Sequence, residues 1–161
     1  MAGILLSDKT ALEAAEKIKG LKTAFADAGI GFGDVFPLLL TDNGGEFSNA
    51  AAFENDFNGN RETRLFFCDP NKSYQKPHVE KNHTLFRDIV PKGESFDDFS
   101  QETVNLIFSH VNSVKRKALN GRTPFEMFAF TYGETAAKVL GIESIPPQEV
   151  IQSPKLLRQS L

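Results

Sequence analysis

The chain has 161 residues with 40% hydrophobic content and 15 Phe, which predicts a packed globule of one domain's length and excludes a disordered chain. No apolar run is long enough to cross a membrane as a helix. The single cysteine, Cys68, excludes an internal disulfide and fits a reducing, cytoplasmic environment.

The net charge of −3 argues against nucleic acid as a partner, because phosphate binding usually needs positive charge. The distribution of charge weakens that objection. One basic group comprises Lys72, Lys76, Lys81, Arg87 and Lys92, a second comprises Lys115, Arg116, Lys117 and Arg122, and the acids gather at Glu94, Asp97, Asp98 and Glu102. Acidic and basic surfaces can coexist on one domain, so the total charge does not decide the partner.

The first half of the chain has the pattern of strands alternating with helices. The expected elements are a short strand at 3–6, a helix over 11–28 capped by Ser7 or Asp8, a loop at 31–34, a strand over 35–41, a helix over 48–57 and a strand over 64–68. The strand over 35–41 is nearly all apolar, as in a central parallel strand covered on both faces, and Pro37 marks its first residue or an irregularity. Strand, helix and strand with short links predict a right-handed parallel crossover.

The second half reads as helices. One is expected from Pro77 to about Asp88, with Pro in its first turn, and the residues at 91–93 end it. Ser100 is a predicted N-cap for a helix with an apolar face through Val114, and Thr123-Pro124 starts another through 130. A short helix follows Gly133, and the pattern does not place the remaining tail.

Two carboxylates stand in positions that suit catalysis. Asp42 ends the apolar strand before an Asn-Gly-Gly turn, and Glu80 lies just inside the helix that begins near Pro77. Such a pair can hold a divalent metal for phosphoryl transfer. The alternatives are ordinary: an Asp that bonds turn amides, and a solvated helix glutamate.

The residues at 41–47, 67–70 and 75–83 resemble motifs of the integrase-type core of DDE transposases, specifically the bacterial insertion-sequence branch of the retroviral-integrase-like superfamily. The residues at 91–93 and 120–126 resemble the same branch, so the resemblance runs from about 4 to 128. It implies an α/β fold: a ribonuclease-H-like three-layer core with a partial, mainly parallel sheet flanked by helices, plus a C-terminal helical extension. The implied domains are 1–98, a partial catalytic core lacking its first strands, and 99–161, helices and a tail packed on that core.

The resemblance also implies the chemistry, which is DNA cleavage and strand transfer with Mg²⁺ or Mn²⁺. Asp42 and Glu80 would be the second and third acids of the family's three, both catalytic and metal-binding. The family's first Asp lies on an opening strand that this chain starts too late to include. We therefore expect an N-terminally truncated core that is inactive alone. The alternatives are a decayed transposase remnant that acts only in binding and association, or another metal-dependent nuclease of the same fold.

Four basic residues near Glu80 are expected to contact DNA phosphates, namely Lys72, Lys76, Lys81 and Arg87. The helical offset places Arg87 two turns after Glu80, on the same face. Solvated lysines and an ordinary surface charge pair at Arg87 are the alternatives. The expected partners of the intact parent are transposon ends and target DNA. A homo-oligomer is also expected, through an unpaired strand edge at 4–6.

Overall fold

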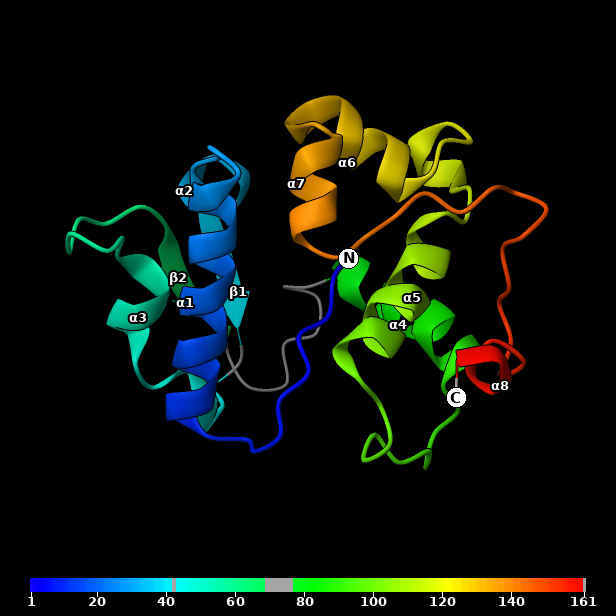
Figure 1. Ribbon diagram of the computed structural model, residues 1–161, viewed down its shortest axis with the longest axis horizontal. Coiled ribbons are helices and arrows are strands. Elements are labelled where there is room, and N and C mark those ends of the chain that lie inside the picture. Colours follow the sequence, from blue (N-terminus) through cyan, green and yellow to red (C-terminus); the bar gives the residue numbers. More distant parts are fainter. Residues whose placement is uncertain (42, 69–76, 161) are drawn as a thin grey trace. The chain divides into compact units, whose positions relative to one another are not determined.

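The computed structural model of the chain describes residues 1–41, 43–68 and 77–160, and its account of side chains omits 77–82, 159 and 160. The chain forms two compact units (Figure 1). The strand unit comprises residues 6–75, and the helical unit comprises residues 1–5 together with 76–161. Among the described residues, no helix has both the length and the apolar character needed to cross a membrane.

The strand unit contains the predicted parallel pair. Its elements are α1 (Ala11–Asp27), α2 (Phe32–Val35), β1 (Leu38–Thr41), η1 (Gly45–Phe47), α3 (Ala50–Glu54) and β2 (Arg64–Phe67). β1 and β2 pair in parallel, in a register that runs from Leu38 opposite Arg64 to Thr41 opposite Phe67. The parallel crossover and the long first helix are thereby confirmed.

Several boundaries in this unit differ from the sequence prediction, and α3 (Ala50–Glu54) is shorter than the helix expected over 48–57. The cap of α1 is Thr10, not Ser7 or Asp8, and its hydroxyl accepts a hydrogen bond from the Glu13 amide at 3.2 Å. The loop expected at 31–34 is wrong, because α2 forms there and buries Phe32. β1 begins directly after Pro37, as expected for a residue that cannot donate to a strand ladder.

The sheet exposes one apolar face. Leu38, Leu40 and Phe66 are 49%, 51% and 47% exposed, and the register together with strand alternation puts all three on the same side. The prediction that both faces of this strand are covered is therefore wrong for the described residues. The strand unit contributes only two described strands, and its helices α1 and α3 pack without burying this face.

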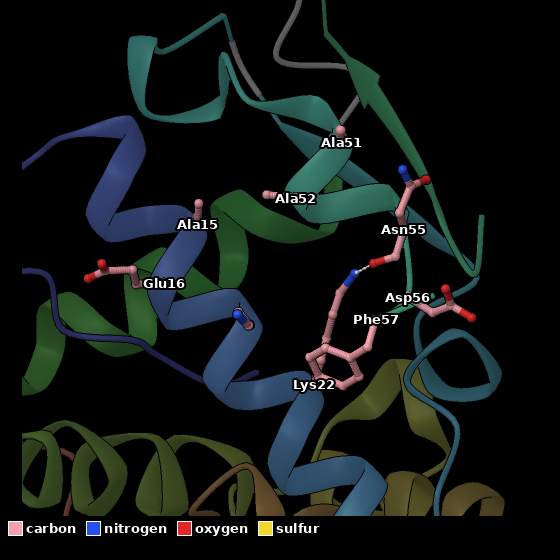
Figure 2. Close-up of a pocket in the computed structure, with 9 residues that line it drawn as sticks. Ala15, Glu16, Lys22, Ala51, Ala52, Asn55, Asp56 and Phe57 are labelled. Carbon is pink, nitrogen blue, oxygen red and sulfur yellow. Dashed lines mark hydrogen bonds between the residues drawn. The ribbon is translucent and has the colours of Figure 1, made fainter. Parts of the chain in front are cut away.

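A buried lysine links three segments of the strand unit. The Lys22 side chain is 4% exposed, and its ammonium donates to the Phe53 carbonyl at 2.9 Å. It also donates to the Asn55 carbonyl at 2.7 Å (Figure 2). The same nitrogen lies 2.8 Å from a carboxylate oxygen of Glu62. Lys22 thus joins α1 to the end of α3 and to the segment that enters β2. Its partners satisfy a charge that would be costly to bury alone.

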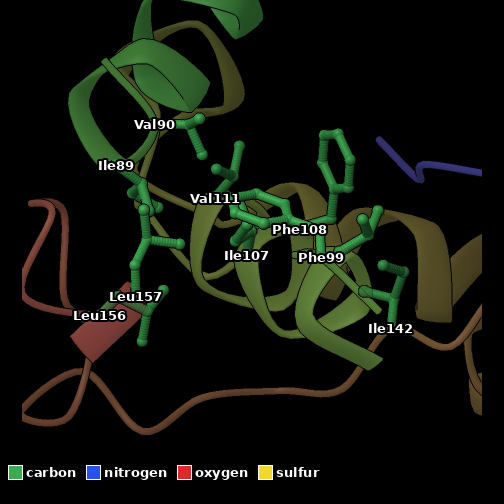
Figure 3. Packing of buried hydrophobic residues seen from close by; sticks show 10 residues of the cluster. Ile89, Val90, Phe99, Ile107, Phe108, Val111, Ile142, Leu156 and Leu157 are labelled. Atoms are coloured by element: carbon green, nitrogen blue, oxygen red, sulfur yellow. The ribbon is translucent and has the colours of Figure 1, made fainter. Parts of the chain in front are cut away.

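The helical unit is built around α5. Its helices are α4 (Pro77–Ile89), α5 (Gln101–Asn112), η3 (Lys117–Leu119), α6 (Pro124–Tyr132), α7 (Glu134–Val139) and α8 (Leu157–Ser160). Pro77 is the first residue of α4, and Ser100 caps α5 by accepting from the Thr103 amide at 3.2 Å, so both predicted starts are confirmed. Ile107 and Val111 of α5 are fully buried with residues from the end of α4 and from α8 (Figure 3).

The strand expected at 3–6 is wrong, because these residues form no strand. The amide of Leu5 donates to Gln101 Oε1 at 2.9 Å, and Gln101 Nε2 donates to the Gly3 carbonyl at 2.9 Å. The side-chain amide of Gln101 therefore makes the backbone hydrogen bonds that a neighbouring strand would have made. The edge on which the homo-oligomer prediction rested is absent.

The tail that the sequence left unplaced lies along α5. Ser109 Oγ accepts from the Glu143 amide at 3.0 Å, Ser113 Oγ accepts from the Ile145 amide at 2.9 Å, and His110 Nδ1 accepts from the Ile151 amide at 3.0 Å. Ser109 and His110 of α5 are buried, and so is Ser113, the C-cap of this helix. The proposed division of the parent core into 1–98 and 99–161 stays a prediction.

Candidate catalytic and DNA-binding site

The carboxyl end of β1 is where the chain reaches the first predicted acid. Thr41 is 6% exposed, and its carbonyl accepts from the Cys68 amide at 2.8 Å. The parallel pairing thus holds to the last residue of β1. Ligands of open α/β sheets bind at the carboxyl ends of strands. Asp42, the next residue, lies outside the described residues.

The turn after Asp42 is fixed by packing. Gly44 allows a close approach, since a Cβ at that position would lie 2.5 Å from a carboxylate oxygen of Glu46. That carboxylate pairs with the Lys9 ammonium at 3.2 Å. The Phe47 ring then contacts the Phe53 ring of α3, with centroids 5.7 Å apart. Glu46 therefore has a structural role, an ion pair with Lys9, that sequence reasoning did not assign to it.

Glu80 and Lys81 both lie on α4, which begins at Pro77. The predicted helical placement of Glu80 is confirmed, and its side chain and that of Lys81 lie outside the description. Helical spacing puts Glu80 and Arg87 on one face. Lys72 and Lys76 also lie outside the described residues.

Arg87 is exposed in the last turn of α4. Its guanidinium lies 5.9 Å from the centroid of the Phe86 ring. The ion pairs of the described residues do not include Arg87. The side chains of 77–82, Glu80 included, lie outside the description, so an ordinary surface charge pair at Arg87 stays an alternative.

The described residues contain no cluster of three or more His, Cys, Asp or Glu side chains that could hold a metal. The acidic residues after Asp8 and before Asp42 lie on helices. The Glu13 carboxylate accepts from the amides of Ser7 at 2.7 Å and Asp8 at 2.6 Å, and these backbone hydrogen bonds lower the pKa of Glu13. Asp27 ends α1, and Asp34 lies in α2. A common site for Asp42, of the strand unit, and Glu80, of the helical unit, stays a prediction.

Comparison with known proteins addresses the resemblance directly. The chain is 35% identical over 66 residues to the transposase of insertion sequence element IS1086 from Cupriavidus metallidurans, a region that covers 41% of the chain and 20% of that protein. The chain is related to insertion-sequence transposases. The resemblance predicted from the motifs is confirmed at this level.

Two further relatives match a longer segment. A putative integrase, ORF3 of Spiroplasma virus SpV1-R8A2 B, is 32% identical over 90 residues, or 56% of the chain and 27% of that protein. The transposase of IS4351 from Bacteroides fragilis is 29% identical over 90 residues, or 56% of the chain and 26% of that protein. The chain thus spans between 20% and 27% of the length of these three relatives. No family model matches the chain, and no solved structure matches it.

Proposed function

We propose that this chain is part of a ribonuclease-H-like catalytic core of a DNA transposase, and that Asp42 and Glu80 are its catalytic, metal-binding acids. The observation that carries the proposal is the parallel β1–β2 pair, whose pairing runs to Thr41. A residue that follows such a strand end stands where α/β sheets bind ligands. The relation to transposases and integrases supports the same reading.

The donor chemistry fits the metal. Asp42 and Glu80 offer carboxylate oxygens, which Mg²⁺ and Mn²⁺ prefer, and Mg²⁺ keeps several waters when proteins supply few ligands. A bound ion would polarise the phosphodiester and lower the pKa of a bound water. The contribution of the chain is to hold and orient the ion with two carboxylates.

Lys72, Lys76, Lys81 and Arg87 would position the DNA by contacts to phosphates, without reading sequence. Arg87 supports this role because it is exposed and unpaired with acids in the described part of the chain. In the parent protein the DNA would be transposon ends and target.

The polypeptide alone would be inactive. The family's in-line displacement at phosphorus uses three acids, and only Asp42 and Glu80 of this chain stand at positions that match those acids. The acids before Asp42 support this, since the Glu13 carboxylate is committed to backbone amides and the rest lie on or beside helices.

A second candidate function is an association module without catalysis. The exposed face formed by Leu38, Leu40 and Phe66 favours it. A second copy is the proposed occupant of this face, because two identical apolar faces related by a two-fold axis would bury one another.

A nicking assay with Mn²⁺ separates these candidates. The chain alone should not nick supercoiled DNA, whereas the chain joined to the opening strands of a related transposase should. Glu80→Gln in the joined protein should abolish nicking, and Glu94→Gln, an exposed acid outside the proposed site, should preserve it. A joined protein that folds, binds DNA and never nicks would favour the association module.

A further inference from the structure

Helix α6 is apolar on most of its surface, yet none of its residues is buried. Its sequence from Pro124 to Tyr132 contains Phe125, Met127, Phe128, Ala129 and Phe130. Phe130 is 83% exposed, the largest exposed fraction of any large apolar side chain among the described residues. A helix with apolar residues all round is normally covered by other protein. This helix therefore presents a surface that suits a partner.

A hollow of about 610 Å³ lies beside this helix, within the helical unit. α6 and α7 are joined by the single residue Gly133, whose φ of +86° allows the sharp turn between them. The apolar lining is Phe125, Ala129, Phe130 and Ile142, and the polar lining is Glu126, Glu134, Lys138, Glu143 and Ser144. The hollow thus has apolar walls between two short helices and an ionised rim.

The rim is acidic. Three carboxylates stand against one ammonium, and the ion pairs of the described residues include none of these four groups. Glu126 is already engaged, since its carboxylate accepts from the Thr123 amide at 2.7 Å in the capping box of α6. Glu134 and Glu143 are exposed. These two acids are the groups that can meet a cation on an incoming partner.

The acidic charge of the rim indicates which kind of partner the hollow suits. DNA would bring phosphates against carboxylates, which repel. A second copy packed symmetrically, rim against rim, would bring equally acidic groups together, and like charges placed together cost free energy. An apolar segment flanked by lysine or arginine would pack on the apolar walls and pair with the carboxylates of the rim.

We propose that the hollow between α6, α7 and residues 142–144 binds an amphipathic helix of a partner protein, with a Leu- or Phe-bearing face flanked by basic residues. The apolar face would pack on Phe130 and Ala129 and enter the hollow over Ile142, in the manner of helix-in-groove recognition. The basic flanks would pair with Glu134 and Glu143. The proposal does not depend on the proposed chemistry of Asp42 and Glu80.

The test uses the full chain and a designed, labelled 18-residue helical peptide with Leu at i, i+3, i+4 and i+7 and Lys on both flanks of that face. Fluorescence anisotropy should give saturable binding. A second peptide with Glu in place of every Lys should bind at least ~10-fold more weakly. These two measurements need no variant protein. No binding of the Lys peptide at millimolar chain, or equal binding of both peptides, would overturn the proposal.

Variants then locate the site. Phe130→Ala should weaken binding of the Lys peptide by about 10-fold, because an exposed aromatic anchor is lost. Phe57→Ala, which removes another exposed Phe, should leave it unchanged. The double change Glu134→Lys with Glu143→Lys should reverse the preference in favour of the Glu peptide, and Glu149→Lys, also exposed, should not. Unchanged binding in Phe130→Ala would overturn the assignment. Sedimentation that shows a dimer of the chain broken by Phe130→Asp would do the same, since the occupant would then be a second copy.

Discussion

The ammonium of Lys22 lies 2.8 Å from the Glu62 carboxylate, in a side chain that is 4% exposed. Lys22→Ala removes this pair and the two carbonyl hydrogen bonds of the same nitrogen. Breaking a buried pair from one side leaves the partner charge uncompensated, and we expect a loss of about 3 kcal/mol in the free energy of unfolding of the strand unit. Urea denaturation followed by circular dichroism measures it. Lys19→Ala, an exposed lysine of the same helix, should change stability by less than ~0.5 kcal/mol. Equal effects of the two changes would show that the Lys22 contacts contribute nothing specific.

Stability should fall as the pH drops below about 6.5, through His110. Burial lowers the pKa of His110, whose Nδ1 accepts from the Ile151 amide. The unfolded chain therefore takes up the proton first as the pH falls, so the free energy of unfolding is full above the unfolded pKa and declines below it. His110→Gln, which can still accept from Ile151, should flatten the decline.

Two features serve as controls for that experiment. His83 is exposed, and His83→Gln should leave the slope unchanged. The Met1 amine has a pKa lowered to about 6, by burial first and by Arg116 second. Its titration also lowers the free energy of unfolding as the pH falls from the unfolded pKa of the amine to about 6. This contribution is the same in wild type and in His110→Gln. A decline of equal slope in both proteins below pH 6.5 would contradict the assignment to His110.

Weak Mg²⁺ or Mn²⁺ binding should be lost in Asp42→Ala. Two carboxylates leave most of the coordination sphere to water, so millimolar affinity is expected rather than tight binding. Titration followed by the amide signals of Asn43 and Glu80 measures it. Asp27→Ala removes an exposed acid at the end of α1 and should leave the titration unchanged. Identical responses in wild type and Asp42→Ala would exclude this residue as a ligand.

DNA binding by the chain should be weak, independent of sequence and steeply dependent on salt. Each neutralised phosphate releases counterions, so the plot of log affinity against log salt steepens by about one unit per contact. Arg87→Ala should reduce that slope by about one, whereas Lys155→Ala, another exposed cation, should not. Binding that ignores salt would point to a protein partner or base stacking instead.

Self-association, if it uses the exposed sheet face, should respond to Leu40→Lys. A charge at this half-exposed position opposes burial of Leu38 and Phe66 against a second copy. Sedimentation equilibrium should show a smaller mean mass for Leu40→Lys at high concentration. Leu12→Lys changes a residue that is 71% exposed on α1 and should leave the mass as in wild type. A monomeric wild type at high concentration would remove this association.

Local signals in the sequence determined where most elements begin. The starts of α4, α5 and α6 could be predicted, because the amides of a first helical turn have no partner within the helix. Pro77 has no amide hydrogen to satisfy, whereas Ser100 and the Thr123–Glu126 capping box accept hydrogen bonds from such amides. The two apolar runs at β1 and β2 with a short helix between them predicted a parallel pair. The motifs around Asp42 and Glu80 also identified the relation to transposases.

Contacts between distant residues decided the rest. Residues 3–6 have strand-like composition, yet Gln101, almost a hundred positions away, takes their backbone hydrogen bonds. Ser109, His110 and Ser113 are polar residues on a helix with an apolar face, and only the return of the tail supplies the amides that let them be buried. An apolar pattern likewise predicted burial for Leu40, whose exposure depends on whether another element reaches that face. The sequence specified capping and strand formation because these depend on neighbours within a few residues, whereas burial and the partners of polar side chains depend on which distant segments the fold brings together.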